Sequence, residues 1–305
     1  MRDPRAEAFE RVGGRWEVRV LEPSPPAVGE PPFFADDPVA GGDVSPVERP
    51  GTDSWAAVCT EDPELRAWCE ERWLVRGALA PLPDGFVATR LALHAVAEHV
   101  VAPSRHAANG KIGLRYTYLG FGTPFFGDDR QVRVEDGLLA VSDRHIERRE
   151  HLSTLRAAAA FVDLPVPAST GVYAPTTAGD LDAALVVDQV CARALGDWFG
   201  FCASALEQLR AEAGEAGSPS RLQLWPEHFD LAVDLGPPEA RANFGGSPGD
   251  DLHPEPYLYV GPWVVPTTGD PFWNEPFGAS LAYQALLDGA DPLAFFRTGK
   301  ALLQG

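Results

Sequence analysis

The amino-acid sequence predicts an α+β protein in which antiparallel sheets are flanked by helices. Two kinds of pattern alternate along the chain. Apolar residues spaced by two, as in residues 15–21, indicate half-buried strands, and apolar residues at helical spacing, as in residues 180–214, indicate helices. Of the 305 residues, 45% are hydrophobic and 23% are charged. That composition is typical of a folded globular protein and not of a disordered one.

The N-terminal part is expected to begin with a strand and to continue through a long surface loop into two helices. Trp16, Val18 and Val20 alternate with charged residues in the strand at 15–21, and repeated prolines break any regular element between 22 and 52. Helices are predicted over 62–76 and 85–101, and Pro103 is expected to end the second.

Residues 111–142 change to a β pattern, and Asp136-Gly137 is a typical two-residue hairpin turn between two apolar runs. The mixed charges of residues 144–151 favour a solvated segment. A short helix should follow, with Ser153 or Thr154 as its N-cap.

The chain is expected to divide into an N-terminal half (1–163), a linker (164–179) and a C-terminal half (180–305), either as separate domains or around one shared core. A long helix over about 180–214 should pack on the C-terminal sheet. The other C-terminal elements expected are strands in 222–236, 239–246 and 257–265, with short helices at 277–287 and 292–303.

Charge and cysteine content exclude several classes of protein. The formal net charge of −19 disfavours nucleic acid and anionic membranes as partners. Cys59, Cys69, Cys191 and Cys202 form no zinc-binding or disulfide pattern, and no nucleotide-cofactor motif is present.

We expect a cytoplasmic protein, because no apolar signal or membrane span is evident. The scarcity of lysine among many Ala, Gly and Pro residues suggests a GC-rich bacterial genome.

Gly245-Gly246-Ser247-Pro248-Gly249 has the letters of a G-x-S-x-G nucleophile motif. The residue after such a serine must donate its backbone N–H to an oxyanion, and proline has none. Ser247 is therefore interpreted as a turn residue.

The first candidate site lies in the C-terminal half. We expect His228 and Asp230 to share one face of a strand, because residues two apart do so. A loop folding back over that face would add Asp250, His253 and Glu255.

These five residues suit a divalent metal, and His228, Asp230 and His253 could serve in catalysis, with a histidine base oriented by a carboxylate. The alternative is an ordinary polar strand face followed by a polar loop.

The second candidate site is a basic group at Arg105, Asn109, Lys111 and Arg115. These side chains lie between a helix end and the start of a strand, where they could bind a small anionic molecule. The alternative is a cationic helix C-terminus followed by an Asn-Gly turn. Aromatic residues of the C-terminal third, with Trp273-Asn274-Glu275-Pro276 as a covering loop, could line a ligand cleft or belong to the core.

Residues 224–230 (LWPEHFD) and 247–263 (SPGDDLHPEPYLYVGPW) resemble a pattern seen in a group of uncharacterised bacterial proteins. Residues 111–116 and 122–127 are similar to the same group. The resemblance implies no activity, because none is assigned to that group, and it implies no site residues.

Three functions remain open on the sequence alone. The chain could bind a small molecule at an anion-accepting or aromatic cleft. It could be a metal-assisted or His/Asp-dependent hydrolase-like enzyme. It could also be a non-catalytic interaction protein with a large exposed apolar patch.

Overall fold

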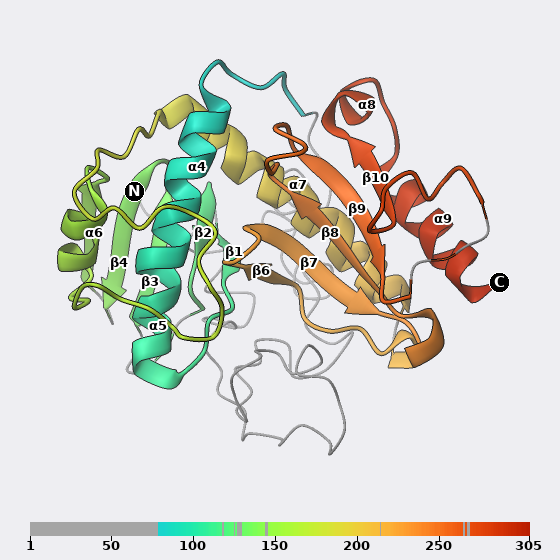
Figure 1. Cartoon of the computed structure of the whole chain (residues 1–305), viewed down its shortest axis with the longest axis horizontal. Coiled ribbons are helices and arrows are strands. Elements are labelled where there is room, and N and C mark those ends of the chain that lie inside the picture. Colours follow the sequence, from blue (N-terminus) through green and yellow to red (C-terminus); the bar gives the residue numbers. More distant parts are fainter. Residues whose placement is uncertain are drawn as a thin grey trace, which may run out of the picture.

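The computed structural model describes residues 79–305 apart from residues 118, 125, 127–129, 144–145, 214, 265 and 267–268. Two antiparallel five-stranded sheets and several helices make up this part of the chain, which confirms the α+β prediction (Figure 1). The predicted strand 15–21, loop 22–52 and helix 62–76 lie outside the described residues. Within the described part, no helix combines the length and apolar character needed to cross a bilayer.

The first sheet has its strands in sequence order: β1 (Arg115–Thr117), β2 (Gly120–Gly122), β3 (Arg130–Glu135), β4 (Leu138–Asp143) and β5 (Ile146–His151). The predicted hairpin is confirmed. Asp136 and Gly137 have φ angles of 57° and 78° and join β3 to β4. Positive φ at both turn residues is the geometry that matches the twist of paired strands.

Strand β5 corrects the prediction that residues 144–151 form only a solvated segment. Its six side chains are all exposed, although its backbone pairs along β4. Both faces of an exposed edge strand are wet, so no apolar alternation marks it in the sequence. Arg149 pairs with Glu147 on the same strand and reaches Glu135 on β3.

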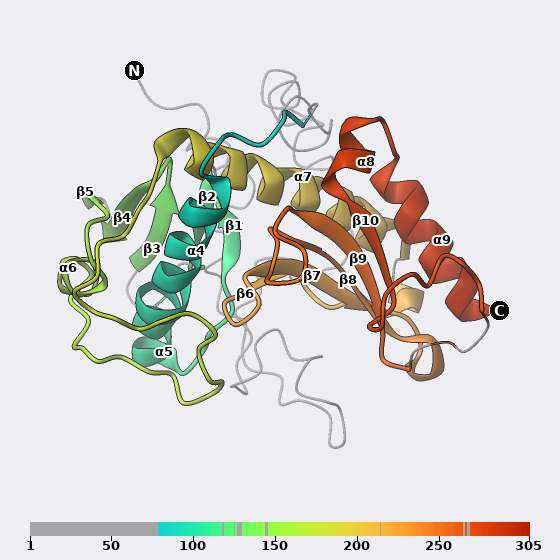
Figure 2. The ribbon, with the colours of Figure 1, turned by 45° about the horizontal axis from the view of Figure 1, so that its top comes forward.

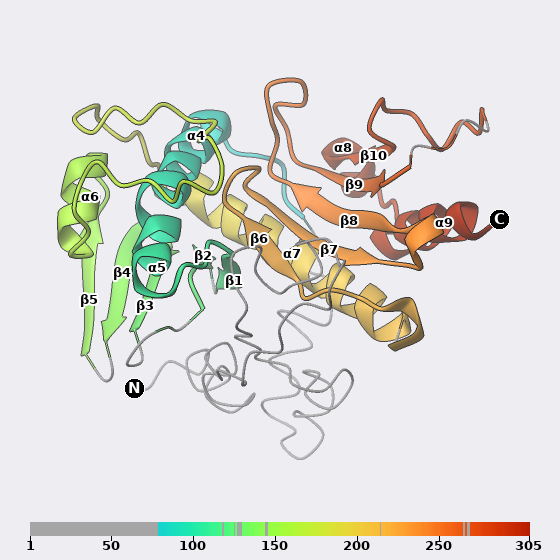
Figure 3. The same cartoon turned by 60° about the horizontal axis from the view of Figure 1, so that its bottom comes forward.

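The second sheet has the order β10-β9-β8-β7-β6. Its strands are β6 (Gln223–Trp225), β7 (Asp230–Leu235), β8 (Ala242–Ser247), β9 (Tyr257–Pro262) and β10 (Ala279–Ala282), and short 3-10 turns η4 (Glu215–Gly217) and η5 (Pro238–Ala240) precede β6 and β8. Leu114 and Leu224 form a single antiparallel bridge, so β1 and β6 lie side by side between the sheets (Figure 3).

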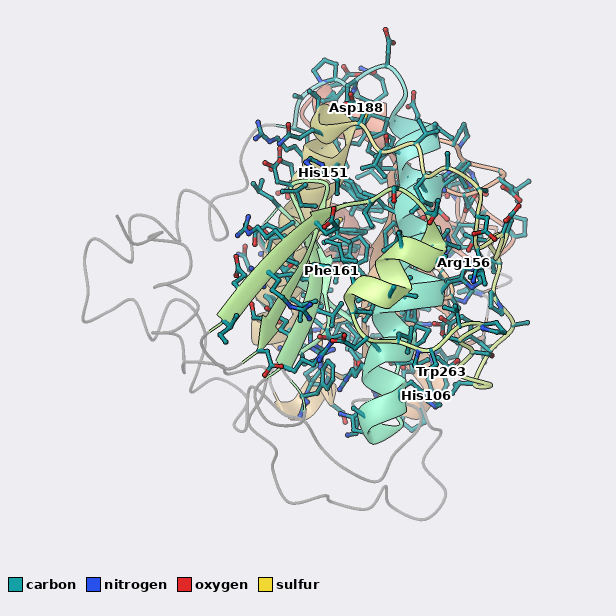
Figure 4. The ribbon with its side chains drawn as sticks, turned by 90° about the vertical axis from the view of Figure 1, so that its left-hand side faces the viewer. His106, His151, Arg156, Phe161, Asp188 and Trp263 are labelled. Atoms are coloured by element: carbon teal, nitrogen blue, oxygen red, sulfur yellow. The ribbon has the colours of Figure 1, made fainter. Side chains whose placement is uncertain are left out.

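The predicted helix 85–101 is present as α4 (Phe86–Val96) and the π-helical turn η3 (Ala97–Val101), but its end was wrong. The helical rod continues as α5 (Ala102–Asn109), with Pro103 in its first turn. Figure 4 shows the rod beside α6 (Leu155–Phe161). Of the two predicted N-caps, Ser153 and Thr154, it is Thr154 whose side chain accepts the N–H of Ala157.

The long helix α7 (Gln189–Ala213) begins nine residues later than the expected start at Asp180. The carboxylate of Asp188 accepts the N–H groups of Val190 and Cys191 and so sets the start. Helix α7 contacts β1 and β2 of the first sheet and β7 and β8 of the second (Figure 2). One hydrophobic core cluster contains residues of both sheets and of α7.

The predicted linker 164–179 contains no helix or strand in the structure. The predicted helix 277–287 was wrong in its first half, which is strand β10, and only α8 (Tyr283–Leu287) is helical. The predicted last helix is confirmed as α9 (Pro292–Gln304), capped by the carboxylate of Asp291.

Candidate functional site

A stripe of buried polar residues, Arg90, His94 and Glu98, runs along α4 and η3, and each of them holds a different loop. The guanidinium of Arg90 donates to the carbonyl of Gly249 in the β8–β9 loop. Nε2 of His94 lies 2.9 Å from the carbonyl of Pro226 in the β6–β7 turn. A carbonyl can only accept, so Nε2 carries the proton. Burial lowers the pKa of His94, although Glu98 opposes this effect.

Glu98 holds the loop between α6 and α7, which passes in front of the helical rod (Figure 1). Its two carboxylate oxygens accept the backbone N–H groups of Thr176 and Thr177 at 2.9 Å and 2.8 Å, and both threonine hydroxyls also donate to it. Glu98 is buried and lies in the π-helical turn, an irregularity frequent at functional sites. Three loops therefore meet on one helix, which is how rigid scaffolds commonly position binding residues.

The β6–β7 turn corrects the prediction that His228 and Asp230 lie on one strand face. His228 is exposed and belongs to the turn, whereas Asp230 is the buried first residue of β7. The turn ends at Phe229, whose φ of 53° is unusual for a bulky residue. Its ring stacks on His94 with centroids 5.0 Å apart and packs against Phe121. That packing holds a backbone conformation of the kind that gathers at functional sites.

Asp230 receives a hydrogen bond from the phenol of Tyr259, which lies two strands away on β9. Gly245 on β8 is the cross-strand partner of Tyr259. A Cβ atom at Gly245 would lie 2.5 Å from the Tyr259 hydroxyl oxygen, so only glycine lets the phenol cross β8. Gly245, the first glycine of the G-x-S-x-G motif, is therefore required where the phenol passes β8. Ser247 is the last residue of β8, and its hydroxyl accepts the N–H of Gly249 at 3.1 Å.

Two carboxylate oxygens beside the β6–β7 turn are buried without a hydrogen-bond partner: Oδ1 of Asp230 and Oε2 of Glu227. The buried hydroxyl of Tyr173, from the loop held by Glu98, has none either. Burial raises the pKa of Asp230 and of Glu227, and the neighbouring His228 opposes both shifts. Glu227 also interacts electrostatically with Asp230 and with Glu98, so these acidic groups form one cluster.

The β8–β9 loop carries Asp250 and His253. The phenol of Tyr257 and the backbone N–H of His253 donate to Asp250 at 2.6 Å and 2.7 Å. Burial alone would raise the pKa of Asp250, but these bonds keep it below the ordinary value. Nε2 of His253 lies 3.1 Å from a carboxylate oxygen of Glu275. The histidine thus sits between two carboxylates.

The predicted metal ligands do not gather at one point. Glu255 is exposed and interacts electrostatically with Tyr283. Among the described residues, no group of three or more His, Cys, Asp or Glu side chains is placed to hold a metal ion. The metal hypothesis therefore gains no support from the placement of these residues.

The second predicted site is more buried than an open anion site would be. Arg105 donates to the carbonyl of Gly113, and Arg115 donates to the carbonyl of Leu114 and, at 3.2 Å, to Gln223. Lys111 is buried, and its backbone N–H donates to the side chain of Asn109. The two arginines thus satisfy backbone carbonyls where the chain passes from α5 to β1. Anion binding at this place stays a prediction.

Sequence reasoning missed the polar stripe on α4 and did not connect Glu227, Tyr259 or Glu275 with the first candidate site. The helix was recognised by its apolar residues, one of which, Leu91, is 44% exposed in the structure. The missed signal is the four-residue spacing of Arg90, His94 and Glu98, which places all three on one helix face. Tyr259 could not be found this way, because its contact depends on strand order.

No family model, curated protein or solved structure matches this chain. The function of the site therefore has to be argued from its own geometry.

Proposed function

We propose that this protein binds a small polar molecule where the three loops meet beside Asp230 and Glu227. The observation that carries the proposal is the pair of buried carboxylate oxygens that have no partner among the described residues. Leaving a buried acceptor unpaired costs about 1–3 kcal/mol, more for a charged group. Such a cost is found at sites where a bound molecule supplies the missing donors.

The surroundings of the two carboxylates support binding. His228 is exposed between them in the sequence, so the β6–β7 turn reaches the surface. The Glu98 bonds fix the loop that carries Tyr173, and the Arg90 bond fixes the β8–β9 loop. Loops fixed in advance lose less freedom on binding, which favours affinity.

The test is a thermal-shift screen of amino acids, sugars, nucleosides, amines and carboxylic acids. A ligand at about a hundred times its Kd adds about 2.7 kcal/mol to the free energy of unfolding. We expect the stabilisation to disappear in Asp230→Asn and to persist in Glu150→Gln, which alters an exposed carboxylate on β5.

Stabilisation that survives Asp230→Asn would contradict the proposal. Stabilisation by anions that is lost in Lys111→Ala but kept in Asp230→Asn would instead support the predicted basic site.

A second candidate function is acid–base catalysis at the same place. It is favoured by a specific observation: burial raises the pKa of Asp230 while the exposed His228 lies two residues away. A carboxyl and an imidazole tuned by their surroundings are typical proton donors and acceptors. Asp230 would hold or release a proton, and His228 would exchange protons with solvent.

Catalysis is tested with chromogenic ester, amide and phosphoester substrates. Turnover should fall in His228→Ala at least about a hundredfold, the lower end of general acid–base effects. His228 is exposed, so we expect His228→Ala to fold like wild type, and circular dichroism checks this. Turnover that is equal in wild type and His228→Ala would contradict this function.

A further inference from the structure

We infer that the molecule bound beside Asp230 and Glu227 is an organic cation whose ammonium group donates to Oδ1 of Asp230 and Oε2 of Glu227. This inference rests on the proposed function and names the ligand class of the same site. Both oxygens are acceptors that lack a donor, and Asp230 is only 6% exposed. A primary ammonium carries three donors and a positive charge, which suits two carboxylates that interact electrostatically with each other.

The charges around the site favour a cation. Carboxylates come from three segments: Glu98 on η3, Glu227 and Asp230 at the β6–β7 turn, and Asp250 and Asp251 in the β8–β9 loop. The protein as a whole carries −19. Such a field attracts cations and repels anions.

Each of the nearby buried basic groups directs a donor to a backbone carbonyl, although the Nε–H of Arg90 has no acceptor among the described residues. Arg90 donates to the carbonyl of Gly249 and interacts electrostatically with Asp250 and Asp251. His94 donates its Nε2 proton to Pro226, and burial lowers its pKa, which favours the neutral ring. Neither group donates to the unpaired oxygens of Asp230 and Glu227 in the hydrogen bonds of the described residues.

Glu98 shows what a satisfied buried carboxylate looks like in the same cluster. Its oxygens accept backbone N–H groups and hydroxyls from Thr176 and Thr177. Asp230 has the phenol of Tyr259 and its own backbone N–H, with Oδ1 left without a partner, and the Oε2 atom of Glu227 has no donor. The difference locates the missing donors at the β6–β7 turn and not at η3.

Aromatic rings add to the preference for a cation. The rings of Tyr257 and Tyr259 lie 6.4 Å apart, and Tyr259 touches Asp230 through its phenol. Tyrosine faces attract ammonium groups by about 0.5–2 kcal/mol, depending on desolvation. Burial also raises the pKa of Asp230 and Glu227, so a bound cation would draw both carboxyls to the ionised form.

The test compares head groups on matched carbon chains. The probes are the primary amines from ethylamine to hexylamine, with the alcohols and the carboxylates of the same chain lengths, at constant ionic strength. Binding is measured by titration calorimetry on the full chain, in two buffers of different ionisation enthalpy. We expect amines to bind best, and any protons released when the bound cation lowers the raised pKa values of Asp230 and Glu227 appear as a difference between the two buffers.

Two variants and one control assign the binding to the site. Asp230→Asn and Glu227→Gln should each weaken amine binding by about tenfold to a hundredfold, as expected for one lost hydrogen bond to a charged group. Glu150→Gln removes an exposed carboxylate from β5 and should leave the affinity unchanged.

The outcomes separate this inference from the proposed function. Alcohols or carboxylates that bind better than amines and lose affinity in Asp230→Asn would overturn the cation and keep the binding site. Amine binding that survives both variants would place the cation elsewhere and overturn the inference. If no probe binds in an Asp230-dependent way, and the wider screen also finds none, the proposed function fails as well.

Discussion

The two ends of strand β7 each hold a buried aspartate, and the two carboxylates have different partners. Asp234 is 5% exposed and lies 2.6 Å from Nε of Arg241, which is itself buried. Asp230 is 6% exposed and receives the phenol of Tyr259, while its second oxygen is unpaired among the described residues. One end of the strand therefore has a buried ion pair, and the other has an acid whose donors are neutral groups, a phenol and its own backbone N–H.

The different partners indicate a structural role for the carboxylate of Asp234 and make the carboxylate of Asp230 a candidate functional group. Burial raises the pKa of Asp234 to about 6 even though Arg241 lowers it, so the counter-charge of Asp234 is a buried arginine of the protein itself. Asp230 has no such cation and sits where three loops meet. An acid left incompletely satisfied in a well-packed protein is a site at which a bound molecule can be accommodated.

The largest expected effect is at the paired end. Arg241→Met should lower the free energy of unfolding by about 3–5 kcal/mol, because it leaves the buried Asp234 without its cation. Urea denaturation near neutral pH measures the loss. The double variant Arg241→Met with Asp234→Asn should recover part of it. A loss below about 1 kcal/mol in the single variant would show that this pair resembles an exposed one.

A smaller loss is expected when Asp230 loses its phenol. Tyr259→Phe should cost about 1–3 kcal/mol, because the buried carboxylate then has no donor from β9. The cost should be smaller in the Asp230→Asn background. Tyr283→Phe is the matched control, since its phenol donates to the backbone carbonyl of Ala80 at 2.7 Å. Equal costs of Tyr259→Phe in both backgrounds would mean that the phenol and Asp230 are not coupled.

The sequence was sufficient for elements whose signal is local. The β3–β4 hairpin follows from Asp136-Gly137, and the start of α6 follows from Thr154. The start of α7 was placed too early, because residues 180–188 have helical composition but Asp188 sets the N-cap. Edge strand β5 was missed, because its exposed side chains carry no apolar pattern.

Only part of the candidate site could be predicted from the sequence, because many of its contacts are not local. The sequence drew attention to His228, Asp230, Asp250 and His253, but placed His228 on a strand that it does not occupy. The partners that give Asp230 its environment come from far along the chain. The phenol of Tyr259 reaches it only because β8 lies between β7 and β9 with a glycine at the crossing.

The smallest expected effect is the pH dependence of stability that comes from Asp230. Burial raises the folded-state pKa of Asp230, so its contribution to stability is present below the unfolded-state pKa, about 3.9, and is lost as pH rises through the folded-state pKa. Asp230→Asn has no such loss. The variant should therefore gain stability over wild type as pH rises, by at most about 1.4 kcal/mol per pH unit.

Urea denaturation of wild type and Asp230→Asn from acid to neutral pH measures the gap, which is the difference between their free energies of unfolding. Glu150→Gln serves as the exposed-carboxylate control. A gap that shrinks with rising pH would mean that Asp230 is ionised and well satisfied in the folded protein. If the stability and binding predictions both hold, Asp230→Asn is more stable than wild type at neutral pH and no longer binds ligand. Greater stability with lost binding is the pattern expected of a residue kept for function at the expense of stability.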